Sequence, residues 1–238
     1  MNSPVADSAA SRLVRLGTAL ISDILDEAGF HANVISNAIG PYGSRKPFCG
    51  PATCVRGIAK VVTSTSPAPA AMLPTYQLPS FVKHGHVLVL DTGNFYGGAV
   101  VGSMLLRDIA ACGVVAIVTD GLVRDVEDIP RSGLPLAAAG ATPLNSARRW
   151  SIIEENCVAI MPAQGGGTVR ITPLDLVVGD ADGIVVVPSE HAEAIADMAE
   201  EVARRESLLN KTVVDANPAG VARARAQRFS DTTWLRGK

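Results

Sequence analysis

Residues 87–120 read VLVLDTGNFYGGAVVGSMLLRDIAACGVVAIVTD, and this stretch decides the fold. It begins with a short apolar run, VLVLD (87–91), and ends with a second apolar run, VVAIVTD (114–120). Between them, after a glycine-rich segment, residues 99–112 have the apolar spacing of a helix that stops at Gly113. This order predicts a right-handed βαβ unit with two buried, parallel strands.

Two loops are expected at the ligand-binding edge of this unit, because ligands of parallel sheets collect beyond the carboxyl ends of the strands. The first loop is GNFYGG, whose backbone amides precede a helix and can hold a carboxylate or a phosphate. It matches neither GxGxxG nor a P-loop, so a dinucleotide or nucleoside triphosphate site is not predicted. The second loop is DGLVRD (120–125), which follows the second strand.

The second loop places Arg124 directly beside Asp125. Asp125 offers a hard oxygen ligand for Mg²⁺, an ion that keeps several waters and takes further ligands from substrate oxygens. Arg124 is a permanent cation that can stabilise the oxyanion formed when a bond beside a 2-oxo group breaks. The alternative is an exposed ion pair worth less than about 1 kcal/mol. Two loops of complementary chemistry at one edge favour a functional site.

The remaining elements are predicted from periodicity and turn chemistry. Residues 18–28 predict a helix capped by Thr18 and ended by Gly29, and the run from Cys54 to Thr65 predicts a strand. In the closing third, GGGTVRITPLDLVVGDADGIVVVP predicts a strand, TVRI, followed by a hairpin of LVVGD and IVVVP. Ser189 is expected to cap a long amphipathic helix.

Composition excludes several classes of function. The 238 residues are 47% apolar and carry 21 Lys plus Arg against 23 Asp plus Glu, without a basic run interleaved with aromatics, so no nucleic-acid partner is predicted. No apolar run reaches the roughly 18 residues of a membrane helix, which predicts a cytoplasmic protein that is not bound to a membrane. The four cysteines lack paired CxxC spacing and are expected to be reduced and structural.

Three other segments have a possible chemistry and a simpler alternative. Lys60 in the predicted strand could form a Schiff base if desolvated, although an edge-strand lysine with its ammonium in water is the favoured interpretation. His84 and His86 flank a glycine and are more typical of a turn than of a metal-ligand pair. DADG (180–183) resembles the start of a calcium loop but lacks the later ligands.

Three segments of the chain together resemble the RraA-like class II aldolase family. They are GNFYGGAVVGSMLLRDIAACGVVAIVTDGLVRDVEDI, GGGTVRITPLDLVVGDADGIVVVP and a long helix containing ARRE. That family includes 4-hydroxy-4-methyl-2-oxoglutarate / 4-carboxy-4-hydroxy-2-oxoadipate aldolases and the regulator of ribonuclease E activity. The resemblance implies a single compact α/β domain of αββα type over residues 11–210, with the βαβ unit, the C-terminal hairpin and the long helix. Residues 211–238 would form a tail or subunit-contact arm of a homotrimer or homohexamer.

The resemblance also implies a role for individual residues. Asp125 would be the protein ligand of Mg²⁺ or Mn²⁺, and Arg124 would contact the keto oxygen or carboxylate of a small 2-oxo acid. Glu206, with Glu200 and Glu201 as alternatives, would reach the site of a neighbouring subunit. The substrate carboxylate would be held by backbone amides in the glycine loop, from Gly97, Gly98, Ala99, Val100, Val101 and Gly102.

One position departs from the family pattern. Aldolase-type members carry an acidic residue just after the helix glycine, where this chain has Ser103. A serine does not accept a proton as a carboxylate does. If Ser103 takes part in catalysis, proton transfer to a pyruvate enolate is expected to be slower or to pass through Glu206.

Several functions remain open from the sequence. The first is a metal-dependent lyase that cleaves a 4-hydroxy-2-oxo acid to pyruvate or decarboxylates oxaloacetate, or a related lyase acting on a different 2-oxo or hydroxy acid. Another is a non-catalytic regulator that binds a protein partner. A third is a Schiff-base aldolase that uses Lys60. By resemblance, the ribonuclease branch lacks the acid after the arginine, so Asp125 favours catalysis.

Overall fold

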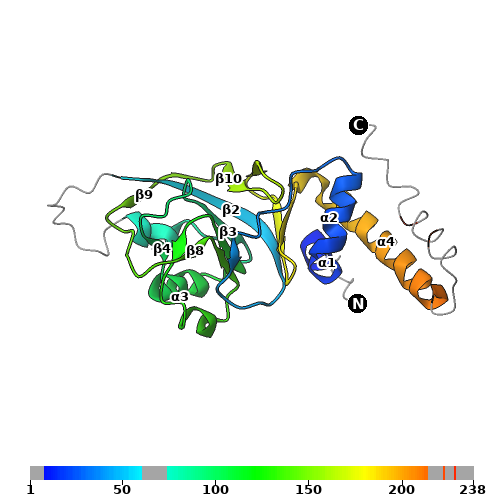
Figure 1. Ribbon diagram of the computed structural model, residues 1–238, viewed down its shortest axis with the longest axis horizontal. Coiled ribbons are helices and arrows are strands. Elements are labelled where there is room, and N and C mark those ends of the chain that lie inside the picture. The colour runs from blue at the N-terminus through cyan, green and yellow to red at the C-terminus, as the bar shows by residue number, and fades with distance from the viewer. Residues whose placement is uncertain (1–7, 61–73, 214–221, 223–227, 229–238) are drawn as a thin grey trace, which may run out of the picture.

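The computed structural model describes residues 8–60 and 74–213, together with Ala222 and Arg228 (Figure 1). The end of the strand predicted from Cys54 to Thr65 and nearly all of the predicted tail lie outside these residues. Within the described part, no helix combines the length and apolar character needed to cross a membrane. The helices are α1 (Ala9–Leu16), α2 (Thr18–Glu27), α3 (Ser103–Ala111) and α4 (Ala192–Val213), with 3₁₀ helices η2 (Pro74–Ser80), η3 (Ile129–Ser132) and η4 (Ser189–His191).

An eight-stranded mixed sheet forms the centre of the molecule. Its four central strands are mutually parallel, and the flanking strands are antiparallel to their neighbours. The spatial order is β1 (Gly40–Pro41), β7 (Leu136–Ala138), β5 (Ala116–Thr119), β3 (Val87–Asp91), β2 (Phe48–Ala59), β12 (Leu176–Gly179) and β13 (Ile184–Val187), and β9 (Trp150–Glu155) also pairs with β2. Every residue of β3 and β5 is buried, which explains their continuous apolar runs.

The predicted βαβ unit is present with one correction. β3 and β5 are parallel neighbours and α3 connects them, but the helix begins at Ser103 and not at residue 99. The preceding residues form β4 (Ala99–Val101), which pairs with β6 (Leu122–Val123) and then β8 (Gly140–Ala141) in a small parallel sheet. Val100 and Val101 are almost fully buried, and β-branched side chains favour a strand at such positions.

The C-terminal hairpin of β12 and β13 is confirmed, and the predicted strand TVRI is β11 (Thr168–Ile171). β11 pairs with β10 (Ala159–Pro162) in a hairpin of its own. The long C-terminal helix is also confirmed, although α4 begins at Ala192 because residues 189–191 form η4.

The cap predicted at Thr18 is wrong. Thr18 is the first residue of α2, and its amide and hydroxyl both donate to the Asp180 carboxylate, at 2.7 Å and 2.6 Å. Asp180 therefore caps the helix from the β12–β13 turn, which gives the DADG segment a structural role.

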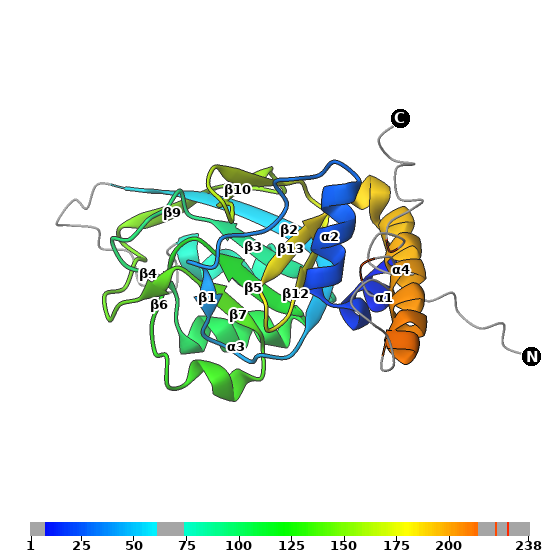
Figure 2. The same ribbon diagram turned by 45° about the vertical axis from the view of Figure 1, so that its right-hand side comes forward.

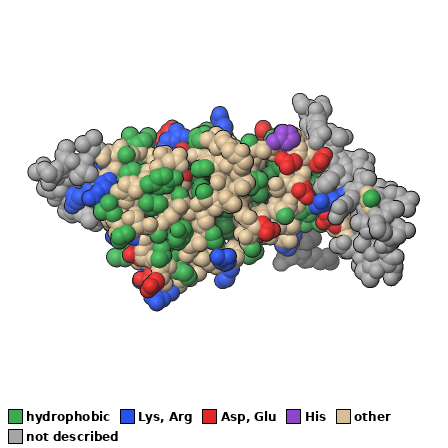
Figure 3. Space-filling view, in the orientation of Figure 1, with side chains coloured by type: hydrophobic (Ala, Val, Ile, Leu, Met, Phe, Trp, Pro, Cys, Tyr) green, Lys and Arg blue, Asp and Glu red, His purple; other side chains and the backbone are tan. Residues whose placement is uncertain are grey.

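Three apolar cores hold these layers together. One face of the main sheet packs against β10 and β11, and the opposite face packs against α3 and η2. The third core lies between the β12–β13 hairpin and the helices α1, α2 and α4. Figures 1 and 2 both show these three helices at one end of the molecule, while α3 and the small parallel sheet lie toward the other end. On the face drawn in Figure 3, most acidic side chains gather near the helical end.

Candidate functional site

Arg124 and Asp125 lie where β6 ends and α3 begins. The Arg124 amide donates to the Val101 carbonyl at 3.0 Å, which continues the pairing of β4 with β6. Asp125 has a φ of +61°, a left-handed conformation that aspartate adopts more readily than most residues. Its Oδ2 atom accepts hydrogen bonds from the amide and the Oγ of Ser103, at 3.0 Å and 3.1 Å. Asp125 therefore caps α3, with the Arg124 Nε 3.9 Å from the same oxygen.

Gly102 allows this close approach of strand end and helix. A Cβ atom at position 102 would lie 2.9 Å from Arg124 Nε and 3.0 Å from Asp125 Oδ2. Its φ of −126° is accessible to other residues, so the requirement is for space and not for backbone freedom. Any larger residue would push the Arg124 or Asp125 side chain aside.

Asp120 organises the loop after β3. It is 1% exposed and accepts hydrogen bonds from the Thr92 amide, the Thr92 hydroxyl and the Asn94 amide at 2.6 to 2.8 Å. Burial raises the pKa of the Asp120 carboxyl, and these three hydrogen bonds partly offset that rise. No local sequence pattern indicates this role, because the Asp120 side chain contacts residues 26 and 28 positions earlier in the chain.

Asp91 anchors the same loop from β3. It accepts from the Gly93 amide at 3.1 Å and from the Ile160 amide at 3.0 Å, and it pairs with Arg56 at 3.0 Å. Sequence reasoning assigned no role to Asp91 or to Arg56. Together with Asp120, Asp91 fixes the loop whose glycines were predicted to bind an anion.

The six predicted amide donors have different environments. Val100 and Val101 point their side chains into the core, and the Ala99 amide donates to the Leu144 carbonyl at 2.7 Å. Gly98 packs against the backbone of Ser146. Amides available to an anion are expected in the first turn of α3 after Ser103, whose own amide donates to Asp125, because the first N–H groups of a helix have no acceptor inside it.

Arg124 lies between two neighbouring pockets. One, which we call the α3 pocket, has a volume of about 430 Å³, and its lining includes Tyr76, Gly102, Met104, Asp108, Arg124 and Asn145. The second, the acidic pocket, has a volume of about 490 Å³, and its lining includes Arg124, Asp125, Glu127, Asp128 and Thr142. The guanidinium can therefore contact a ligand that occupies either pocket.

The three candidate glutamates lie on α4, at the helical end of the molecule (Figure 1). Glu200 pairs with Arg12, and the pKa of Glu200 is lowered by that hydrogen bond. Arg204 and Arg205 donate hydrogen bonds to Glu201 and lower its pKa to about 2. Glu206 pairs with Arg228. The single chain therefore does not bring Glu206 to Arg124 and Asp125.

The histidine pair lies at the opposite edge of the sheet. His86 comes just before β3, and its Nδ1 is 3.0 Å from the Thr53 hydroxyl. Burial, followed by the charge of Lys83, lowers the pKa of His86. The other residue of interest, Lys60, follows the end of β2, and its amide donates to the Arg149 carbonyl at 2.8 Å.

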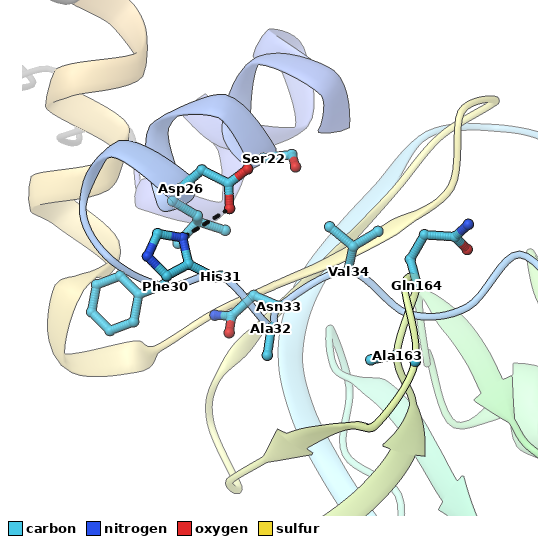
Figure 4. Close-up of a pocket in the computed structure, with 12 residues that line it drawn as sticks. Ser22, Asp26, Phe30, His31, Ala32, Asn33, Val34, Ala163 and Gln164 are labelled. Atoms are coloured by element: carbon cyan, nitrogen blue, oxygen red, sulfur yellow. Dashed lines mark ion pairs between the residues drawn. The ribbon is translucent and has the colours of Figure 1, made fainter.

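A further pocket of about 240 Å³ lies between the end of α2 and the β10–β11 turn (Figure 4). The Asp26 and His31 side chains face one another across its edge, with 3.4 Å between Oδ1 and Nδ1. Both side chains are more than half exposed. Neither Arg124 nor Asp125 lines this pocket, so it is separate from the candidate site.

The donor set at Asp125 is compatible with Mg²⁺ or Mn²⁺ only if most ligands come from outside the chain. Among the described residues there is no group of three or more His, Cys, Asp or Glu side chains that could hold a metal. Asp125 nevertheless keeps Oδ1 beyond its contacts to Ser103, and Mg²⁺ is commonly bound by one or two carboxylates plus substrate oxygens and water. The residues therefore fit a substrate-completed metal site.

Comparison with known proteins agrees with the fold. A family model described as RraA-like, Aldolase/RraA, matches residues 18–186. This protein belongs to the RraA-like family. The structure of RraAS2 from Streptomyces coelicolor, titled an unusual member of the RNase ES inhibitor RraA protein family, superposes with a TM-score of 0.71. That match is 25% identical and covers 88% of this chain and 100% of RraAS2.

This RraA-like protein is also similar to curated proteins, two of them from Halalkalibacterium halodurans and Legionella pneumophila. A "Putative 4-hydroxy-4-methyl-2-oxoglutarate aldolase" of Halalkalibacterium halodurans is 26% identical over 83% of this chain and 85% of its own length. Protein DlpA of Legionella pneumophila is 25% identical over 94% of this chain. The match spans only 34% of DlpA, so this chain corresponds to about a third of that protein.

Proposed function

We propose that this RraA-like protein is a divalent-metal-dependent carbon–carbon lyase that acts through a pyruvate enolate. Its substrate would be a 4-hydroxy-2-oxo acid, with oxaloacetate decarboxylation as the related reaction. The observation that carries the proposal is the juxtaposition of Arg124, Asp125 and the first turn of α3 beside the α3 pocket. Relatives named as aldolases support the same reaction class.

The chain's own residues would bind and orient the 2-oxo acid. Amides of the first turn of α3 that follow Ser103 would hold the substrate carboxylate, and Arg124 would contact the 2-oxo group. Asp125 would hold Mg²⁺ or Mn²⁺, which when bound supplies Lewis-acid polarisation of the 2-oxo group. Ser103, through its two hydrogen bonds to Asp125, is a positioning residue and not the proton acceptor.

The bond changes define where charge must be stabilised. When the C3–C4 bond of a 4-hydroxy-2-oxo acid breaks, its electron pair moves toward the keto oxygen, and the C4 hydroxyl loses a proton as C4 becomes a carbonyl. The enolate then takes a proton at C3 and becomes pyruvate. A guanidinium beside the keto oxygen stabilises this developing negative charge. Glu206 of a neighbouring subunit is the candidate for proton transfer.

Pyruvate release tests the proposal. Oxaloacetate and 4-hydroxy-4-methyl-2-oxoglutarate are incubated with the protein and Mg²⁺, and EDTA or the Asp125→Asn substitution should abolish release. Asp182→Asn, which changes an exposed acid of the β12–β13 turn, is the matched control. Activity that survives EDTA would overturn the metal mechanism, and borohydride trapping would then test Lys60. If neither substrate is turned over and the protein also catalyses no Mg²⁺-dependent exchange of the pyruvate methyl protons, the alternative of a non-catalytic regulator of a protein partner takes precedence.

A further inference from the structure

The α3 pocket is lined by uncharged polar groups, which we call the polar wall, as well as by Arg124. Arg124 and Gly102 line the pocket, and so do Tyr76 and Asn145. If the 2-oxo acid portion is held at Arg124, the substituent at C4 has to be accommodated by the remaining lining. This inference rests on the proposed function and concerns the chemical class of that substituent, which we call the arm.

Hydrogen bonds fix the orientation of the polar wall. The Asn145 Oδ1 accepts from the Ala147 amide at 2.6 Å, and the Asn145 Nδ2 donates to the Tyr76 hydroxyl at 3.1 Å. The Tyr76 hydroxyl therefore accepts a hydrogen bond from inside the chain and keeps its own proton to donate to a ligand. A hydroxyl group on the arm is a suitable acceptor.

Thr75 adds an unused hydroxyl to the same wall. Thr75 is 3% exposed and lines the α3 pocket, and its Oγ1 has no hydrogen-bond partner within the described part of the chain. Buried hydroxyls without a partner are rare in folded proteins because they lose hydration without compensation. A hydroxylated arm would supply the missing partner.

Charge in the α3 pocket disfavours an anionic arm. Asp108 lies one turn along α3 from Met104 and contributes a carboxylate to the lining. Among the described lining residues, Arg124 is the only cation, and the 2-oxo acid would engage it. A second carboxylate on the arm would lie near Asp108 without a cation of its own.

We infer that the α3 pocket selects 4-hydroxy-2-oxo acids whose C4 substituent is uncharged and bears hydroxyl groups, in preference to dicarboxylic substrates. Tyr76, Asn145 and Thr75 would bind the arm, and Asp108 would disfavour a distal carboxylate. This substrate class differs from the dicarboxylate in the names of the aldolase relatives.

The test runs the reaction in the direction of aldol addition, with pyruvate as the nucleophile and three aldehydes as alternative electrophiles. Pyruvate loses a proton at C3, and C3 forms a bond to the aldehyde carbon, whose oxygen becomes the C4 hydroxyl. Glyceraldehyde gives a neutral hydroxylated arm, propanal a neutral alkyl arm and glyoxylate an anionic arm. We expect kcat/KM for glyceraldehyde to exceed that for glyoxylate by about tenfold or more, with propanal between them.

Two substitutions locate the selectivity. Asp108→Asn should raise the glyoxylate to glyceraldehyde ratio of kcat/KM, and Tyr76→Phe should lower glyceraldehyde addition more than propanal addition. Asp182→Asn, in a turn that does not line the α3 pocket, is the control for loss of an acidic group. A glyoxylate preference in the wild type, or a ratio that Asp108→Asn does not move, would overturn the inference.

A separate readout distinguishes failure of the selectivity from failure of the proposed function. Exchange of the pyruvate methyl protons in D₂O, followed by NMR, reports enolisation without any acceptor. Mg²⁺-dependent exchange together with a glyoxylate preference would overturn the arm selectivity and leave the lyase proposal standing. Absence of both exchange and oxaloacetate turnover would overturn both.

Discussion

At the residue scale, the site depends on a guanidinium and a carboxylate held at one helix end. Arg124→Lys keeps the positive charge but replaces a planar, forked donor with a point charge. We expect oxaloacetate turnover to fall about 100-fold, the loss typical of removing one oxyanion contact. Arg170→Lys, on the exposed side of β11, is the control. Turnover close to wild type in Arg124→Lys would contradict the role given to Arg124.

Gly102 provides the second prediction at this scale. Gly102→Ala should displace the Arg124 or Asp125 side chain, since the added Cβ would lie 2.9 Å from the Arg124 Nε and 3.0 Å from the Asp125 Oδ2. Small displacements of catalytic groups cost up to about 100-fold in rate. We therefore expect turnover to fall while the melting temperature changes little. Gly40→Ala, where an added Cβ meets no atom within 4 Å, should alter neither measurement.

At the element scale, Asp180 caps α2 from a turn distant in sequence. Burial alone would raise the pKa of Asp180, but hydrogen bonds from Thr18, Asp182 and Gly183 outweigh it, so the pKa is lowered. The carboxylate therefore stabilises the fold at pH values above the ordinary aspartate pKa, and this contribution is lost as pH falls through the lowered value. Asp180→Asn should cost about 1 kcal/mol at pH 7.

Urea unfolding of wild type and Asp180→Asn at several pH values checks this prediction. The difference in free energy of unfolding should be constant near neutrality and shrink below about pH 4. Asp182→Asn, two residues away in the same turn, should show a much smaller difference at every pH. A difference for Asp180→Asn that is independent of pH would show that charge has no part in the cap.

The elements also show what sequence could predict. β3, β5 and the β12–β13 hairpin were predicted because strands buried on both faces need continuous apolar runs. The strand β4 was missed because AVV is too short to display a period, and it was joined to the helix that follows. Asp180 and Asp120 were missed because their partners are 162 and 28 residues away in the chain, and no local pattern specifies such contacts.

The candidate site also has a part that the sequence predicts and a part that it does not. The sequence placed Arg124 and Asp125 at one sheet edge with the glycine loop, and the structure places Gly102 and Ser103 against them. The Tyr76 and Asn145 wall could not be predicted, because it joins residues 69 positions apart whose types are common in loops.

At the scale of the whole molecule, α4, which carries Glu206, and α3, which borders the site, lie toward opposite ends of the molecule (Figures 1 and 2). If Glu206 acts in catalysis, it must act in a neighbouring copy. Exposed apolar residues around the site, Met104, Val126 and Leu144, are suited to being covered by such a copy. A homotrimer or homohexamer with shared sites remains our proposal for the assembly.

Subunit mixing checks this arrangement. Asp125→Ala and Glu206→Gln should each be inactive alone, and co-expression should restore part of the oxaloacetate turnover because some sites in mixed oligomers combine an intact Asp125 with an intact Glu206. Native mass spectrometry establishes that mixed oligomers form. Mixed oligomers without recovered activity would contradict a site that combines Asp125 of one subunit with Glu206 of another.

The left-handed backbone of Asp125 has a consequence for how this chain could change over generations. A side chain in that conformation carries a conformational cost, and glycine at the same position would relieve it. Replacement by glycine would remove the carboxylate that caps α3, and the eased turn would offset part of the cost of losing that cap. Loss of this acid therefore need not bring loss of the fold, and the scaffold can outlast the chemistry.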